Sequence, residues 1–130
     1  MNPADLPLVY ACSGCSSAAQ MANDMALRLT REGLAEMSCI AGVGGQVPAL
    51  VRVALSGRPI LALDGCRLAC VASCLQGVGV RADAQVQLAE WGVMKRKHCD
   101  YDPAQAESLW PKVCATARQL KHRATDRSED

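Results

Sequence analysis

The chain has 130 residues, half of them hydrophobic and eight of them cysteine, which is enough for one domain with an aliphatic core. Its net charge of +1 excludes a general attraction to nucleic acid or to an anionic membrane surface. The sequence lacks a signal peptide or an apolar run that could span a membrane, so we expect a cytoplasmic protein whose thiols stay reduced.

Short apolar runs alternate along the chain with segments in which apolar residues recur every three or four positions. The runs predict strands and the periodic segments predict helices. In chain order we expect a strand at 8–11, a helix at about 16–31, a strand at about 35–40, a helix at 48–55, a strand at 60–63, a helix at 68–75, a strand at 86–93 and a last helix from Pro103. Pro111 predicts a kink or a short first segment in that helix. Residues 1–120 would form one domain, followed by a charged, frayed tail at 121–130.

The predicted strands are too apolar for a sheet with one face in water. Helices must therefore cover both faces of a parallel sheet. With right-handed crossovers, the expected fold is a small doubly wound (Rossmann-like) α/β domain, a three-layer sandwich with a mainly parallel four-stranded sheet in the order 2-1-3-4. Sites in such sheets form at the carboxyl ends of the strands, where the strand order reverses.

Five cysteines follow predicted strands and should meet at that edge. Cys12 and Cys15 form a C-x-x-C pair after the first strand, and Cys39 ends the second. Cys66 lies at the start of the third predicted helix, just before Leu68, and Cys70 lies one turn further on the same helix face. Thiolates at helix starts are favoured by the helix dipole. The bend of the C-x-x-C turn is attributed to the conformational freedom of its glycine.

Several chemistries suit such a set of thiols. Cys39 favours a metal over a two-cysteine redox centre, which has no use for further sulfurs. We therefore predict one zinc ion bound by Cys12, Cys15, Cys39 and Cys66, with Cys70 as the rival for the fourth place. A thiol redox enzyme or sulfur carrier, and an iron–sulfur cluster protein, remain the alternatives. The chain lacks the sequence motifs of common nucleophilic and nucleotide-dependent enzymes. The sequence therefore assigns no enzymatic activity, and the question of activity stays open.

Other residues near this edge have simpler expected roles. Asp64 is expected to cap the third helix. Cys74 lies too far along the helix from Cys66 to share its ion, so Cys74 and Cys114 are assigned to the core. His98 and Cys99 fall in an exposed basic loop, where a ligand role is the less favoured interpretation.

The order of the cysteine motifs resembles a known family. The segments Tyr10-Ala11-Cys12-Ser13-Gly14-Cys15-Ser16-Ser17, Ser38-Cys39-Ile40-Ala41-Gly42-Val43-Gly44-Gly45 and Leu63-Asp64-Gly65-Cys66 are similar to those of the DGC-domain family, named for Asp-Gly-Cys. The resemblance runs from about residue 10 to 102. It implies zinc binding through Cys12, Cys15, Cys39 and Cys66, with Cys70 also in a family-like place, but it implies no activity.

Overall fold

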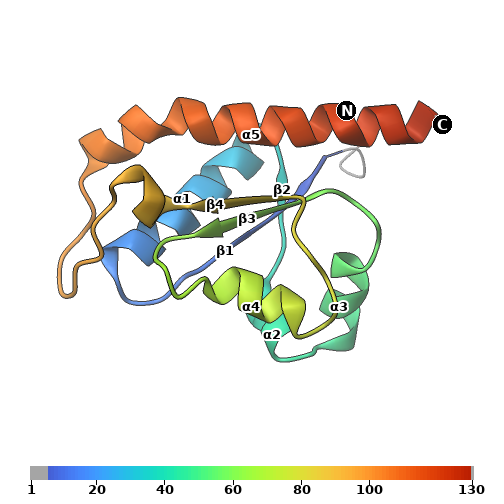
Figure 1. Cartoon of the computed structure of the whole chain (residues 1–130), viewed down its shortest axis with the longest axis horizontal. Coiled ribbons are helices and arrows are strands. Elements are labelled where there is room, and N and C mark those ends of the chain that lie inside the picture. Colours follow the sequence, from blue (N-terminus) through green and yellow to red (C-terminus); the bar gives the residue numbers. More distant parts are fainter. Residues whose placement is uncertain (1–5, 130) are drawn as a thin grey trace.

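The computed structural model describes residues 6–129, with side chains as far as residue 121. Four parallel strands form one sheet: β1 (Leu8–Ala11), β2 (Glu36–Met37), β3 (Ile60–Asp64) and β4 (Ala84–Gln87). Their order across the sheet is β2-β1-β3-β4, as shown in Figure 1. Both the predicted α/β class and the predicted strand order are confirmed.

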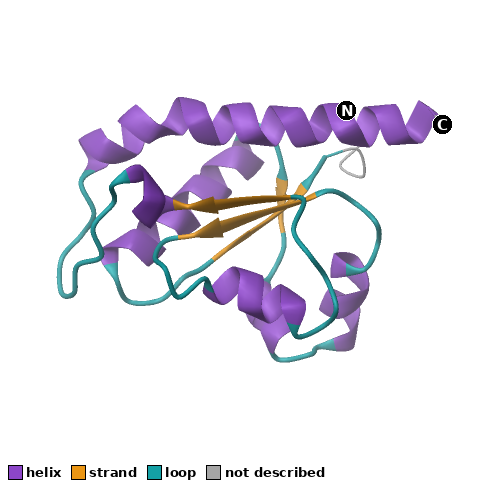
Figure 2. Cartoon of the chain, in the orientation of Figure 1, coloured by secondary structure: helices purple, strands orange, loops and turns teal. Residues whose placement is uncertain are grey.

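Helices cover both faces of the sheet (Figure 2). One face packs against α1 (Ser17–Arg31) and α5 (Pro103–Glu129). The other face packs against α2 (Ile40–Gly44), α3 (Pro48–Ala54) and α4 (Cys70–Gln76). Among the described helices, none is both long and apolar enough to cross a membrane.

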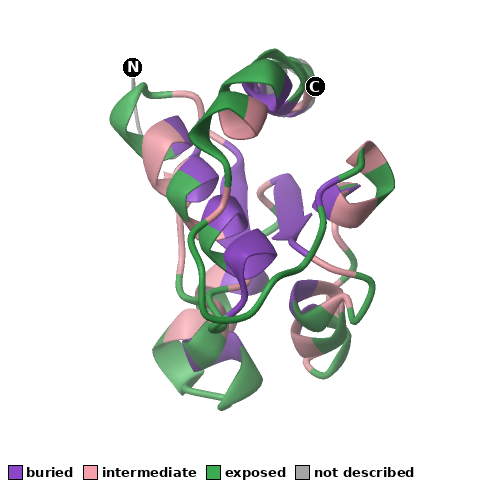
Figure 3. Ribbon diagram, turned by 90° about the vertical axis from the view of Figure 1, so that its left-hand side faces the viewer, coloured by how far each residue is buried: buried purple, intermediate pink, exposed green. Residues whose placement is uncertain are grey.

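The two-faced core follows from the strand sequences. All residues of β1 and β3 are buried, as Figure 3 shows for the centre of the molecule. Successive strand side chains point to opposite faces, so Leu8 and Tyr10 pack toward α2–α4, while Val9 and Ala11 pack toward α1 and α5. Continuous apolar strands are therefore what this sheet requires.

Helix α1 begins and ends at the residues that its sequence predicts. The Ser16 side chain accepts a hydrogen bond from the Ala19 N–H at 3.2 Å, which satisfies a donor in the first helical turn. After the helix, Gly33 adopts a φ of +72°, a conformation that favours glycine.

Two short segments differ from the sequence expectation. The second strand ends at Met37 instead of Ile40, and residues 40–44 form the short helix α2. The fourth strand ends at Gln87, and a 3-10 helix, η2 (Leu88–Trp91), follows it. Val86, Leu88 and Val93 are nevertheless buried. The pattern of apolar residues in this segment predicted one long strand, but a strand followed by a helical turn buries the same residues.

Helix α5 is continuous through Pro111 and extends to Glu129. The expected short first segment is therefore wrong, and the tail expected at 121–130 is helical as far as Glu129. The apolar side chains on both sides of the proline are buried against the core: Leu109, Trp110, Val113, Ala117 and Leu120. Pro111 itself is exposed, so packing of the opposite face holds the helix together despite the missing hydrogen bond.

Candidate functional site

A pocket of about 330 Å³ lies beside the carboxyl ends of β1 and β3. Four of the five predicted ligands line it, and they come from the turn after β1, the turn after β3 and the start of α4: Cys12, Cys15, Cys66 and Cys70. Cys74 of α4, which the sequence assigned to the core, is half-buried and lines the same pocket. All eight cysteines of the chain are free thiols. Residues more than 50 positions apart therefore share one sulfur-rich cavity.

Cys12 is held by the end of β3. Its backbone N–H donates to the Leu63 carbonyl at 3.2 Å, and its Sγ accepts a hydrogen bond from the Gly65 N–H at 3.1 Å. A Cβ at position 65 would lie 2.5 Å from the carbonyl carbon and oxygen of Ala18, in the first turn of α1. Glycine at position 65 therefore lets the strand end approach α1 closely enough to hold the Cys12 sulfur.

The C-x-x-C turn is held by a side chain of α1. Gln20 Nε2 donates to the Gly14 carbonyl at 2.7 Å and to the Ser13 carbonyl at 3.3 Å. Gly14 does not adopt a positive φ, and a Cβ there would make only an ordinary contact of 3.9 Å with Ala19. The bend thus does not depend on Gly14, contrary to the sequence interpretation; Gly65 is the sterically required glycine.

The third predicted helix begins later than expected. Helix α4 starts at Cys70, after Ala69 in a left-handed conformation with φ of +51°, so Cys66 lies in the preceding turn. The predicted shared helix face is therefore wrong, although Cys66 and Cys70 do line one pocket. Asp64 is 1% exposed and accepts hydrogen bonds from the N–H groups of Val71 at 2.8 Å and Ala72 at 3.4 Å, which confirms its capping role.

Cys39 has a different local role. It is exposed, its Sγ accepts a hydrogen bond from the Gly42 N–H at 3.3 Å, and it caps α2. The next residue, Ile40, lines the pocket, whereas Cys39 is not among the lining residues. Cys114 is buried in the core as expected, and Cys99 is exposed.

The charges around the pocket are unequal. Burial raises the pKa of the Cys12 thiol, the Gly65 hydrogen bond lowers it, and neighbouring Asp64, Cys66 and Cys70 raise it further. Lys95 and Lys97 line the pocket, and Lys95 Nζ lies 3.9 Å from Cys66 Sγ. The sequence placed these lysines only in an exposed loop, because nothing local connects them with cysteines some 30 residues upstream.

The donor chemistry fits a soft metal, because thiolates are the ligands that zinc and iron–sulfur clusters prefer. Within residues 6–121, no three His, Cys, Asp or Glu side chains are already arranged to hold a metal ion. Cys15 and Cys70 are exposed at the pocket, and rotation of such side chains would be part of metal binding.

The fold and this pocket define the chain as a small parallel α/β domain with a cysteine-lined site at its carboxyl edge. The family model of the DGC domain matches residues 8–113. The chain therefore belongs to the DGC-domain family. It is also 62% identical over 105 residues to the anaerobic and virulence modulator AnvM of Pseudomonas aeruginosa, a match that covers 81% of this chain and 80% of AnvM. No solved structure matches the chain.

Proposed function

We propose that the protein binds one zinc ion through thiolates of Cys12, Cys15, Cys66 and Cys70. The observation that supports this proposal is the convergence of these four cysteines on one pocket from three separate segments. Four thiolates are a common ligand set for structural or regulatory zinc. Cys39 remains the fifth candidate, since it follows β2 at the same edge of the sheet.

The residues around the pocket would support the thiolates. The Gly65 N–H, which donates to Cys12 Sγ, would orient that sulfur and offset part of its charge. Four thiolates around a divalent ion leave a formal charge of about −2, and Lys95 beside Cys66 would reduce the cost of that charge. The metal itself would supply a rigid link between the β1 and β3 turns.

The experiment is elemental analysis of full-length protein purified without oxygen. We expect close to one zinc per chain, with loss of zinc in Cys15→Ser and Cys66→Ser because each removes one of four ligands. Cys99→Ser is the matched control, since Cys99 is exposed outside the pocket lining, and it should keep its zinc. Cys39→Ser decides between Cys39 and Cys70: retained zinc supports Cys70. Folded protein that takes up no zinc would contradict the proposal.

A second candidate is a thiol redox site. It is favoured by the word anaerobic in the name of the relative, the anaerobic and virulence modulator AnvM, and by the exposure of Cys15 and Cys70 at one pocket. In this role a pocket thiolate would attack an oxidised partner, and a neighbouring cysteine would resolve the resulting bond.

Visible absorption of the same anaerobic samples also tests for an iron–sulfur cluster, which would make them brown.

A further inference from the structure

The loop that carries the two pocket lysines is fastened to the start of α1. The Ser17 N–H donates to the Arg96 carbonyl at 2.9 Å, and the Arg96 N–H donates to Ser17 Oγ at 3.0 Å. Ser17 Oγ also donates to the Met94 carbonyl at 3.4 Å. Ser17 is only 3% exposed. A buried serine two residues after the C-x-x-C turn therefore determines where Lys95 and Lys97 lie.

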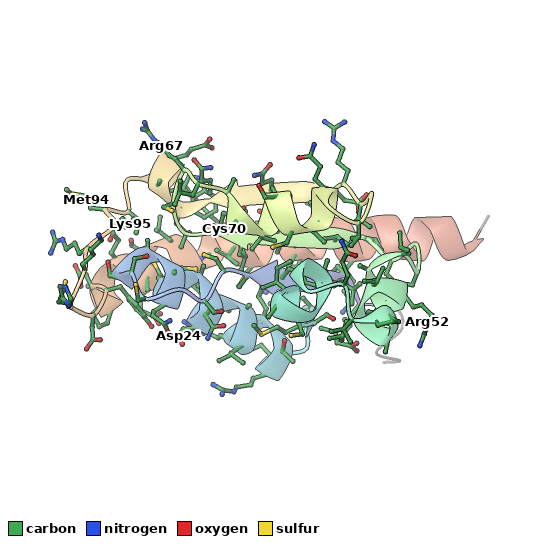
Figure 4. All side chains as sticks on the ribbon, turned by 90° about the horizontal axis from the view of Figure 1, so that it is seen from below. Asp24, Arg52, Arg67, Cys70, Met94 and Lys95 are labelled. Carbon is green, nitrogen blue, oxygen red and sulfur yellow. The ribbon has the colours of Figure 1, made fainter. Side chains whose placement is uncertain are left out.

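This fastening gives the pocket a positive rim. Lys95 and Lys97 both line it, and none of the described lining residues is acidic. Figure 4 shows Lys95 at the end of the molecule that also carries Met94 and Arg67, whereas Arg52 lies at the opposite end. The two ammonium groups therefore present positive charge to a molecule that enters the pocket.

The rest of the wall is apolar. Ile40, Leu68 and Val71 line the pocket together with the sulfurs. A volume of about 330 Å³ is at the lower end of the range of small-molecule sites. One cavity thus combines cations at the rim, apolar side chains on the wall and thiols within reach.

We propose that the metal-free pocket binds and reacts with small anionic disulfides, whose acidic group lies against Lys95 and Lys97 while a sulfur reaches the cysteines. A pocket thiol loses its proton to solvent, and the thiolate attacks one sulfur of the disulfide. The disulfide bond breaks, a mixed disulfide with the protein forms, and the other half leaves as a thiolate. The inference rests on the proposed function in that it takes the same pocket cysteines as the reactive groups.

The test compares two aromatic disulfides that differ in charge, the dianion dithiobis(nitrobenzoate) and the neutral dithiodipyridine. Rates of mixed-disulfide formation at each pocket cysteine are measured on reduced, full-length, chelator-treated protein by peptide mass spectrometry. For each pocket cysteine, the rate with the anionic reagent is divided by the rate with the neutral reagent. This ratio is then divided by the same ratio measured for N-acetylcysteinamide, a small uncharged thiol. Because the thiolate fraction is the same for both reagents, this normalised ratio reports charge selection and not thiol acidity.

We expect a normalised ratio of about ten at low salt, since a charged cleft raises the local concentration of its counter-ions. It should approach one in 1 M salt, where electrostatic interactions extend only about 3 Å. Lys95→Met with Lys97→Met should also lower the ratio to about one. Ser17→Ala should lower it in part, because the lysines keep their charge but lose their position.

Arg52→Met is the matched control, since it removes one positive charge at the far end of the molecule. It should keep the wild-type ratio. A wild-type ratio of one, an unchanged ratio in the double lysine variant, or an equal loss in Arg52→Met would overturn the inference. Zinc content is measured on the same proteins: zinc binding without charge selection rejects only this inference, and charge selection without zinc binding rejects only the zinc proposal.

Discussion

At the residue scale, Gly65 connects the core to the site. Its N–H holds the Cys12 sulfur, and its missing side chain lets β3 approach the backbone of Ala18. The backbone conformation does not require a glycine at this position, because the φ of Gly65 is not positive. The close approach of two backbones explains why glycine occurs in the Asp-Gly-Cys sequence.

Gly65→Ala should therefore destabilise the protein by about 1–3 kcal/mol, since the new methyl group meets backbone atoms that cannot move independently. Gly14→Ala is the matched control in the same site and should change the free energy of unfolding by less than about 0.5 kcal/mol. Urea unfolding of the metal-free proteins measures both changes. Equal midpoints for the two variants would show that the approach at Gly65 is not tight.

Tyr101 links the segment before α5 to α1. Its hydroxyl donates to Asp24 Oδ2 at 2.7 Å, and this bond to a carboxylate, together with burial, raises the pKa of Tyr101 to about 12. A pKa raised by folding means that the stabilisation is fully present below the unfolded value of 10.0 and is lost as the pH rises through about 12.

Tyr101→Phe should cost about 0.5–1 kcal/mol at neutral pH, a modest value because Asp24 is exposed to solvent. The difference in the free energy of unfolding between wild type and variant should stay constant up to pH 10 and disappear near pH 12. Chemical unfolding at a series of pH values measures this difference. A difference that grows above pH 10 would contradict the assigned hydrogen bond.

At the scale of elements, local pattern predicted the long helix α1 and the buried strands well, because their periodic apolar residues are the ones that pack. It failed at 40–44 and 88–91, where four or five residues hold too few turns to show a period. The Cys39 sulfur that caps α2 is also not among the usual capping groups. Short elements of this kind are set by their neighbours.

Pro111→Ala should stabilise the protein by up to about 3 kcal/mol, because it restores an N–H donor and removes the ring in the interior of α5. Pro103→Ala is the control. Pro103 opens the same helix, where the N–H has no partner within the helix, so its replacement should have little effect. Thermal and urea unfolding give both values. A Pro111→Ala protein no more stable than wild type would show that the core already tolerates the proline at no cost.

At the scale of the whole molecule, the site adjoins one end of the core. The two apolar clusters fill both faces of the sheet, whereas the cysteine pocket lies at one end of it. Cys12 is the one predicted ligand that also packs against both clusters. Val71 belongs to the second cluster and also lines the pocket, so a change at the pocket wall is also a change at the edge of the core.

Sequence patterns predicted the parallel α/β fold, the strand order and the sheet edge at which most of the candidate cysteines meet. Apolar strands buried on both faces permit few other arrangements, and the carboxyl ends of parallel strands lie at one edge. The folded structure was needed to show which sulfurs share the pocket, where α4 begins and which lysines lie beside them. Those features depend on contacts such as Ser17 with Arg96 and Gly65 with Ala18, which join distant parts of the chain and leave no periodic signal in it.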